Sequence, residues 1–252
     1  MPTFLLVNDD GYFSQGLQAL RSALRKLGRV VTVAPDRNLS GVGHSLTFNA
    51  PLRMRRVEED FYAVIDGTPA DCVHLGYRVL LNEQKPDLVV AGINEGPNLG
   101  EDITYSGTVS GAMEGRLLGI PSVAFSAFGK DRESIDFNEV AKACLEVVKR
   151  VLREGMPDDV YLNVNVPSLP FEEIKGFKLT RQGKRAYKER VFRYHDPYGK
   201  PFYWIAAEEF GWHAEEGTDY WAVVNGFVSI TPLQVDLTNY RAFNALRFLE
   251  TP

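Results

Sequence analysis

The sequence has few cysteines and no long hydrophobic run. Cys72 and Cys144 are its only cysteines, too few to suggest a disulfide framework or a zinc site, and both lie in apolar, helix-like stretches where we expect buried free thiols. No run of about 18 apolar residues occurs, so we expect no membrane span. The apolar start is too short for a secretory signal and lacks a basic leading region, which favours the cytoplasm.

Positive charge is also in short supply. The formal net charge is −5, with 28 Lys and Arg against 33 Asp and Glu, which disfavours binding of long nucleic acid. A small anionic substrate is compatible with this balance if a metal or a helix N-terminus supplies local positive charge.

Several common catalytic and nucleotide-binding motifs are missing. No Gly-x-Gly-x-x-Gly is found, because Leu46 stands where the third glycine after Gly41 and Gly43 would be. The Gly-rich stretch 92–107 lacks the lysine of a P-loop, and no Gly-x-Ser-x-Gly nucleophile motif occurs. An ATPase site and a serine hydrolase triad are therefore not indicated.

Strand and helix patterns alternate over the first 170 residues. Short apolar or alternating runs predict strands at 4–7, 30–34, 52–57, 61–65, 88–91, 121–125 and 161–166. Helical spacing of apolar residues covers 17–27, 69–81, 108–118 and 140–151. Such βαβ units predict an α/β protein with a three-layer, mostly parallel, Rossmann-like sheet, in which 161–166 is the last strand.

The chain changes character after about residue 170. Aromatic, charged and strand-forming residues dominate 171–225, which we expect to be an extended β-hairpin appendage, followed by a strand at 227–231 and a short helix at 240–249. We therefore divide the chain into an α/β catalytic domain, 1–170, and an arm, 171–252, that assembles identical subunits through its aromatic side chains. Folding of the arm back onto its own domain, giving a monomer, is the alternative.

Three polar motifs follow the carboxyl ends of predicted parallel strands. They occupy residues 8–11, 40–45 and 92–98. Ligands bind outside these strand ends in open α/β sheets, so we expect the three motifs to meet at one rim of the sheet.

Adjacent carboxylates suggest a metal site at this rim. Asp9 and Asp10 are costly to bring together unless a cation lies beside them. With the hydroxyl of Ser40 and the amide oxygen of Asn94 they form an all-oxygen set, which suits Mg²⁺, Mn²⁺ or Ca²⁺. The alternative is that residues 8–11 form an ordinary turn, since Asn, Asp and Gly are common turn residues.

The stretch 105–111 precedes the predicted helix at 108–118. Its hydroxyl and backbone N–H groups would form an anion cradle at the positive end of that helix. Ordinary helix capping by Ser106 or Thr108 is the alternative. His44 is a candidate acid or base, although a lone histidine more often makes a structural hydrogen bond.

These motifs resemble the SurE family, the survival protein E 5′/3′-nucleotidases. The resemblance rests on residues 7–11, 34–45, 67–73, 92–98 and 105–112, in order and with family-like spacing, and is weak beyond residue 170. It implies a metal-dependent phosphomonoesterase that releases phosphate from nucleoside monophosphates, and a homodimer or homotetramer with an exchanged C-terminal arm.

The resemblance also implies roles for individual residues. The ligands of one divalent ion, Mg²⁺ or Mn²⁺, would be Asp9, Asp10, Ser40 and Asn94, with the two aspartates catalytic, and the phosphate would be surrounded by Asn98, Ser106, Gly107 and Thr108. Two other functions stay open: a non-catalytic nucleotide sensor, and a phosphatase that forms an aspartyl-phosphate. The latter usually has two aspartates separated by one residue, whereas here they are adjacent.

Overall fold

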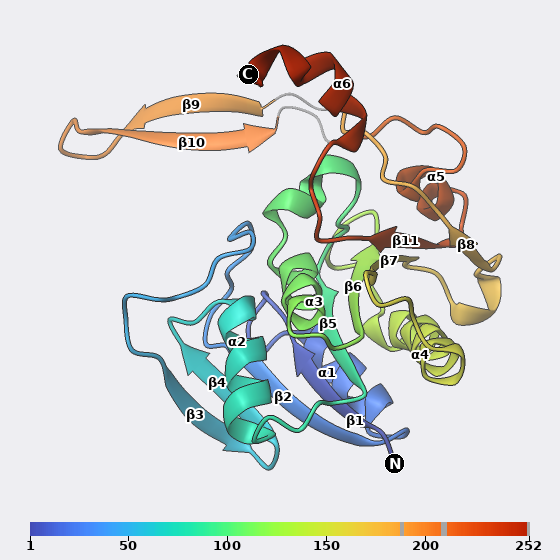
Figure 1. The fold of residues 1–252 in the computed structure, drawn as a ribbon. Helices are drawn as coiled ribbons and strands as arrows, with labels where there is room; N and C mark the ends of the chain where they lie inside the picture. The colour runs from blue at the N-terminus through green and yellow to red at the C-terminus, as the bar shows by residue number, and fades with distance from the viewer. Residues whose placement is uncertain (187–188, 208–210, 251–252) are drawn as a thin grey trace.

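A nine-stranded sheet forms the centre of the protein (Figure 1), in the order β3-β4-β2-β1-β5-β6-β7-β11-β8. The computed structural model describes residues 1–186, 189–207 and 211–250. Its strands are β1 (Thr3–Val7), β2 (Arg29–Pro35), β3 (Arg53–Glu58), β4 (Phe61–Ile65), β5 (Leu88–Asn94), β6 (Ser122–Phe128), β7 (Tyr161–Pro167), β8 (Phe177–Leu179) and β11 (Val228–Leu233). Neighbours from β4 to β7 are parallel, whereas β3 and β11 are antiparallel to β4 and β7. This confirms the predicted α/β class.

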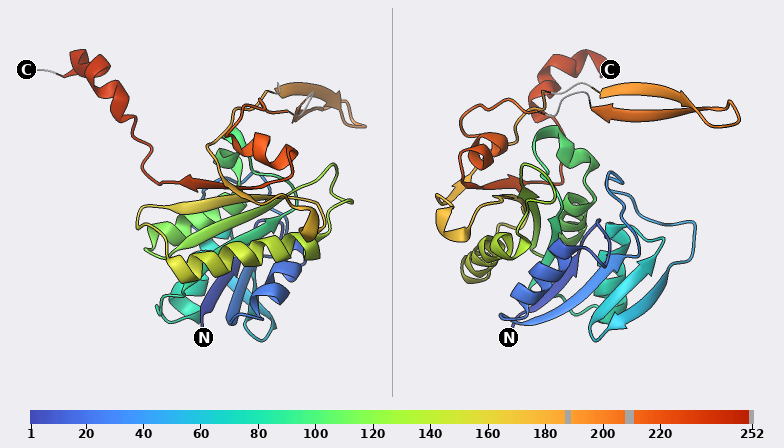
Figure 2. Two further views of the ribbon diagram at one scale, coloured as in Figure 1. Left: turned by 90° about the vertical axis from the view of Figure 1, so that its right-hand side faces the viewer. Right: turned by 180° about the vertical axis from the view of Figure 1, so that it is seen from behind.

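Helices cover both faces of the sheet, giving three layers (Figure 2). One apolar core lies between the sheet and helices α1 (Gln15–Leu24) and α4 (Phe137–Glu154). The other lies beneath α2 (Pro69–Leu75), which continues as a π-helix over Gly76–Leu80, and α3 (Gly107–Leu117). Both cysteines are buried free thiols, as predicted. None of the helices in the described part of the chain is long and apolar enough to cross a membrane.

Local sequence explains where these helices begin. The hydroxyl of Ser14 accepts a hydrogen bond from the N–H of Leu17 and caps α1. Thr68 and Asp71 form a reciprocal capping box at the start of α2. Asp136 accepts from two backbone N–H groups at the start of α4. Each device satisfies donors that the first turn of a helix leaves unpaired.

The strand order reverses between β1 and β5. The chain passes from β1 to β2 on one side, and later places β5 on the other side of β1. In parallel sheets this reversal opens a crevice at the carboxyl ends of the two strands. The residues that follow β1 and end β5 therefore lie where a ligand can enter.

The tail of the chain corrects one expectation. Residues 161–166 are not the last strand, because β11 pairs antiparallel with β7 and β8 pairs with β11. Pairing with β11 covers the edge that β7 would otherwise expose, and it buries Val228 completely. The predicted hairpin appendage is confined to β9 (Glu189–His195) and β10 (Pro201–Ala207), which pair with each other and extend away from the body (Figure 1).

Short helical segments complete the described chain. The tail contains α5 (Asp219–Val224) and, near its end, α6 (Phe243–Leu246) between two 3₁₀ turns, Tyr240–Ala242 and Arg247–Leu249. Two further 3₁₀ turns cover Gly100–Tyr105 and Phe171–Glu173. The single helix predicted at 240–249 is therefore replaced by a short α-helix flanked by two 3₁₀ turns.

Candidate active site

A cavity of about 240 Å³ lies at the carboxyl ends of β1 and β5. It is lined by Asp9, Ser40, Gly41, Asn94, Glu95, Gly96, Pro97, Asn98, Asp102, Tyr105, Ser106 and Arg132. Hollows of about 460 and 650 Å³ elsewhere are larger, but no predicted site residue lines them. The three polar motifs therefore converge as predicted. Asp10, Gly107 and Thr108 do not line the cavity, but they contact Glu95 or Asp9, which do.

The two aspartates are buried side by side. Each is only 2% exposed, and burial raises the pKa of Asp9, although hydrogen bonds from Thr108 and Gly107 oppose the rise. Burial, and then repulsion from Asp9, raise the pKa of Asp10 to about 7. Two buried carboxylates that disfavour each other's charge form an environment that a divalent cation would stabilise.

Neighbouring groups bind the side chains of Ser40 and Asn94, which carry the two neutral oxygens of the predicted metal site. The Ser40 hydroxyl donates to the side-chain oxygen of Asn38 at 2.7 Å, and the same oxygen accepts from the Ser40 N–H at 2.8 Å. The Asn94 amide nitrogen donates to the carbonyl of Gly96 at 2.8 Å. The amide oxygen of Asn94 lies 3.5 Å from the Thr108 hydroxyl, beside Asp9. The Asn94 oxygen is thus held close to Asp9. The Ser40 hydroxyl is bound to Asn38, whose own amide nitrogen lies 3.5 Å from Asp10 Oδ1.

The amino end of α3 lies directly against Asp9. The Thr108 hydroxyl donates a short hydrogen bond to Asp9 Oδ1. A Cβ atom on Gly107 would lie 2.7 Å from the Cβ of Asp9, so only glycine allows the helix to approach this closely. Ser106 caps the helix by accepting from the N–H of Val109 at 3.0 Å, and it also lines the cavity. Capping and site formation are therefore compatible at this residue.

Asparagine side chains from β7 hold Asn98 in the cavity wall. The backbone N–H of Asn98 donates to Asn165 at 2.9 Å, and its carbonyl accepts from Asn163 and Asn165. Its amide nitrogen donates to the Ser126 hydroxyl at 2.7 Å. Parallel strands β6 and β7 thus fix the position of Asn98, which the family resemblance places near a phosphate.

Sequence reasoning missed several groups at the site. Arg132 lines the cavity from the loop after β6, and its charge lowers the pKa of Asp10, opposing the larger effects that raise it. Asp102, which lines the cavity, and Asn38, which contacts Asp10, were also not assigned a role. These residues lie outside the polar motifs, and no spacing in the sequence links Arg132 to Asp10.

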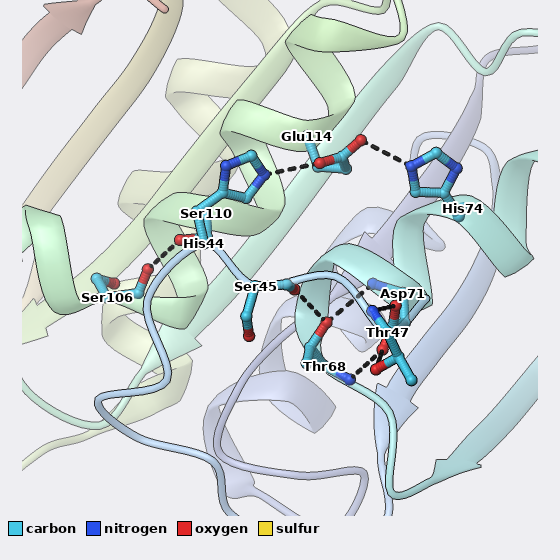
Figure 3. Close-up of polar contacts among 9 residues, drawn as sticks. All are labelled: His44, Ser45, Thr47, Thr68, Asp71, His74, Ser106, Ser110 and Glu114. Atoms are coloured by element: carbon cyan, nitrogen blue, oxygen red, sulfur yellow. Dashed lines mark hydrogen bonds and ion pairs between the residues drawn. The ribbon is translucent and has the colours of Figure 1, made fainter. Parts of the chain in front are cut away.

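His44 is held away from the cavity lining. Its Nε2 lies 2.7 Å from the carboxylate of Glu114, on α3, and the other oxygen of that carboxylate lies 2.8 Å from Nε2 of His74 (Figure 3). His44 is not among the residues that line the cavity. The geometry therefore agrees with the structural interpretation of this histidine rather than with a direct acid or base role.

Comparisons with known proteins agree with this arrangement. A family model described as "Survival protein SurE" matches residues 4–189. The 5′-nucleotidase SurE of Aquifex aeolicus is 77% identical over 250 residues, 99% of each chain, and that of Pelobacter propionicus is 50% identical over 96% of this chain and 97% of its own. A crystal structure of the Aquifex aeolicus SurE protein superimposes with a TM-score of 0.90, at 76% identity over 99% of this chain and 100% of the other. This chain therefore belongs to the SurE family.

Proposed function

We propose that this protein is a 5′-nucleotidase that hydrolyses nucleoside 5′-monophosphates, and 3′-monophosphates as well, to nucleoside and phosphate. The observation that carries the proposal is the buried Asp9–Asp10 pair beside the amino end of α3, with Asp9 lining the cavity at the strand-order reversal. Close relatives, which are named 5′-nucleotidase SurE, support the same activity.

The residues at the site fit one divalent cation per subunit, Mg²⁺ or Mn²⁺. No cluster of three or more His, Cys, Asp or Glu side chains suited to a metal is found among the described residues, so the set must combine two carboxylates with neutral oxygens. Asp9, Asp10, Ser40 and Asn94 supply this combination, which hard cations accept. Bound there, the ion would supply positive charge that polarises a phosphoryl oxygen.

The chain's own groups then have separable roles in hydrolysis. The phosphate would lie at the amino end of α3, where Ser106 and Asn98 line the cavity. Gly107 and Thr108 at this end donate to Asp9 in this structure, and part of their role would be to hold that carboxylate against the phosphate site. Either Asp9 or Asp10 orients the attacking water and accepts its proton. Arg132 adds positive charge on the same cavity, where negative charge spreads over the phosphoryl oxygens.

Free phosphate released from AMP distinguishes this proposal from a nucleotide sensor. Purified protein supplied with Mn²⁺ should release phosphate, and excess EDTA should stop the release until Mn²⁺ or Mg²⁺ is restored. Stoichiometric binding of AMP without phosphate release would support the sensor, and full turnover in EDTA would exclude the metal. An acid-quenched, phosphorylated protein would instead indicate the aspartyl-phosphate route.

Replacing Thr108 by valine tests the role of its hydroxyl, because the two side chains have nearly the same shape. Loss of a hydrogen bond to a charged group costs about 1.5–3 kcal/mol, so we expect kcat/KM for AMP to fall about 10- to 100-fold. Mn²⁺ affinity should be measured in parallel, because in this structure the hydroxyl donates its one proton to Asp9. An unchanged kcat/KM would reduce Thr108 to a packing residue of α3.

We also propose that the tail assembles this chain into a homodimer or homotetramer. Ile205 on β10 is 73% exposed, and Phe248 near the C-terminus is 78% exposed. A two-stranded hairpin is marginally stable alone, and exposed apolar surface of this kind favours burial against a partner. Aromatic side chains of the predicted arm that the structure describes include Phe192, Tyr194, Tyr198, Phe202, Tyr203, Trp204, Trp212, Tyr220 and Trp221, while Phe210 lies outside the described residues.

We propose that residues 1–170 form the catalytic domain and that residues 171–252 form the assembly arm, although part of this arm also belongs to the sheet. The proposed catalytic and phosphate-binding residues all lie within 1–170, but strands β8 and β11 of the 171–252 arm complete the sheet. The tail also contacts a turn at the cavity, where Asp219 accepts from the N–H of Gly100 at 2.8 Å. From the sequence, we still expect the protein to act in the cytoplasm. We also expect it to act on a small nucleotide rather than on long nucleic acid.

A further inference from the structure

The loop that carries Ser40 has no regular secondary structure. It spans residues 36–52, between β2 and β3, and is named here the Ser40 loop. Close to Ser40, backbone hydrogen bonds join Leu39 to the carbonyl of Asp9 at 2.8 Å and Gly43 to the carbonyl of Tyr105 at 3.0 Å. The loop needs further contacts to hold a ligand oxygen in place, since each ordered residue loses about 1–2 kcal/mol of backbone entropy.

A buried carboxylate on α3 supplies one such contact. Glu114 is 6% exposed and bridges His44 of the Ser40 loop to His74 of α2 (Figure 3). Burial raises the pKa of Glu114, but hydrogen bonds from His44 and His74 together lower it more, to about 2. Glu114 is therefore ionised at neutral pH, and hydrogen bonds to an ionised group are the stronger kind. These three residues are named here the Glu114 clasp.

A second carboxylate holds the loop three residues farther along. Asp71 of α2 accepts from the N–H of Thr47 at 2.9 Å and from its hydroxyl at 2.6 Å. The hydroxyl of Thr68 donates to the carbonyl of Ser45 at 2.7 Å (Figure 3). The segment from His44 to Thr47 is thus bound to both α2 and α3, whereas Ser40 and Gly41 themselves are exposed.

We propose that Glu114 is a positioning residue that acts through His44, with His74 as its second donor, to hold the Ser40 loop over the Asp9–Asp10 pair. The inference rests on the proposed function, because it assigns a task to Ser40 as a metal ligand. α3 begins at the wall of the cavity and carries Glu114 near its far end, so one rigid helix fixes Asp9 through Thr108 and the Ser40 loop through His44. The site is then preorganised before a cation arrives.

A purely structural bridge makes a different prediction from a positioning one. The His44 side chain is 29% exposed, so its removal deletes little core packing. If the clasp only adds stability, its loss lowers the melting temperature without changing the affinity for a cation. If the clasp positions Ser40, its loss weakens cation binding. An excess of the cation then restores turnover, because kcat depends on the Asp9–Asp10 pair and the amino end of α3, which the substitution leaves in place.

The test compares Mn²⁺ binding, by isothermal titration calorimetry of the full chain, with turnover of AMP. In His44→Ala we expect the dissociation constant for Mn²⁺ to rise about tenfold, as loss of one charged hydrogen bond implies. Saturating Mn²⁺ should return kcat to within about twofold of the parent. His44→Gln, which keeps an N–H donor in a similar place, should recover most of the affinity.

The matched control is His195→Ala, an exposed histidine on β9 that should bind Mn²⁺ like the parent. Parental Mn²⁺ affinity in a folded His44→Ala protein would overturn the proposal, as would a His44→Gln protein no better than the alanine variant. A parent that neither binds Mn²⁺ nor releases phosphate would instead refute the proposed function. If His44→Ala fails to fold by circular dichroism, the His44→Gln comparison with the parent decides: an affinity far below the parent's overturns the proposal.

Discussion

Replacing Asp9 by asparagine is expected to abolish Mn²⁺ binding and phosphate release while leaving the protein folded. Asp9 supplies one of only two carboxylates in the proposed ligand set. Loss of an outer-shell partner already weakens a metal site about 10- to 100-fold, so loss of a charged ligand should exceed about 100-fold. The fold should survive, because repulsion between Asp9 and Asp10 contributes to the raised pKa of Asp10 and disappears in the variant.

The measurement pairs calorimetric Mn²⁺ titration with thermal unfolding in EDTA. The asparagine oxygen can still accept the hydrogen bond from Thr108, so the melting temperature in EDTA should equal or exceed that of the parent. Asp158→Asn, at an exposed position in a turn, is the control for loss of one negative charge. An Asp9→Asn protein that binds Mn²⁺ with parental affinity would refute the assignment of Asp9 as a ligand.

A chain shortened after Pro170 is expected to be insoluble or unfolded. The cut removes β11, which pairs with β7 from Ser229 to Leu233, and leaves the unpaired edge of β7 exposed. It also removes Val228 from the core. Because Asn163 and Asn165 on β7 hold Asn98, disorder at this edge would reach the cavity. Circular dichroism and sedimentation of the expressed chain measure the effect.

A chain shortened after Asp236 separates folding from assembly. It keeps β8 and β11 but lacks the exposed apolar side chains of the C-terminal segment, such as Phe243 and Phe248. We expect cooperative unfolding, with a smaller mass by light scattering than that of the full chain. A full chain whose mass is that of one subunit at micromolar concentration would contradict the assembly proposal. A soluble, cooperatively folding chain that ends at Pro170 would show that β11 is dispensable.

The parts of the fold that were predictable depend on short-range patterns. Strands such as β1 are buried along nearly their whole length and read as apolar runs, while α4 repeats its buried residues at helical spacing. The rim of polar motifs followed from the same patterns, because parallel strands end at the same edge of the sheet. Sequence patterns alone therefore predicted that Asp9, Ser40 and Asn94 lie close together.

The parts that were not predictable depend on long-range pairing. β11 has the composition of an ordinary strand, and nothing local to Val228 identifies Asn165 and its neighbours on β7 as partners. Glu114 lies in a helix where its charge suggests an exposed position, yet two imidazoles from separate elements surround it. Contacts between residues far apart in the chain leave no periodic signal in a single sequence.

Completion of the sheet by β11 has a consequence for synthesis on the ribosome. β7 ends at Pro167 and β11 begins at Val228, about sixty residues later. At elongation rates of about 5–20 residues per second, the edge of β7 stays unpaired for about 3–12 seconds until β11 has been synthesised. During this interval the nascent chain carries a nearly finished sheet with an open apolar edge. Slower translation of this stretch should lengthen that exposure and raise the demand for chaperones.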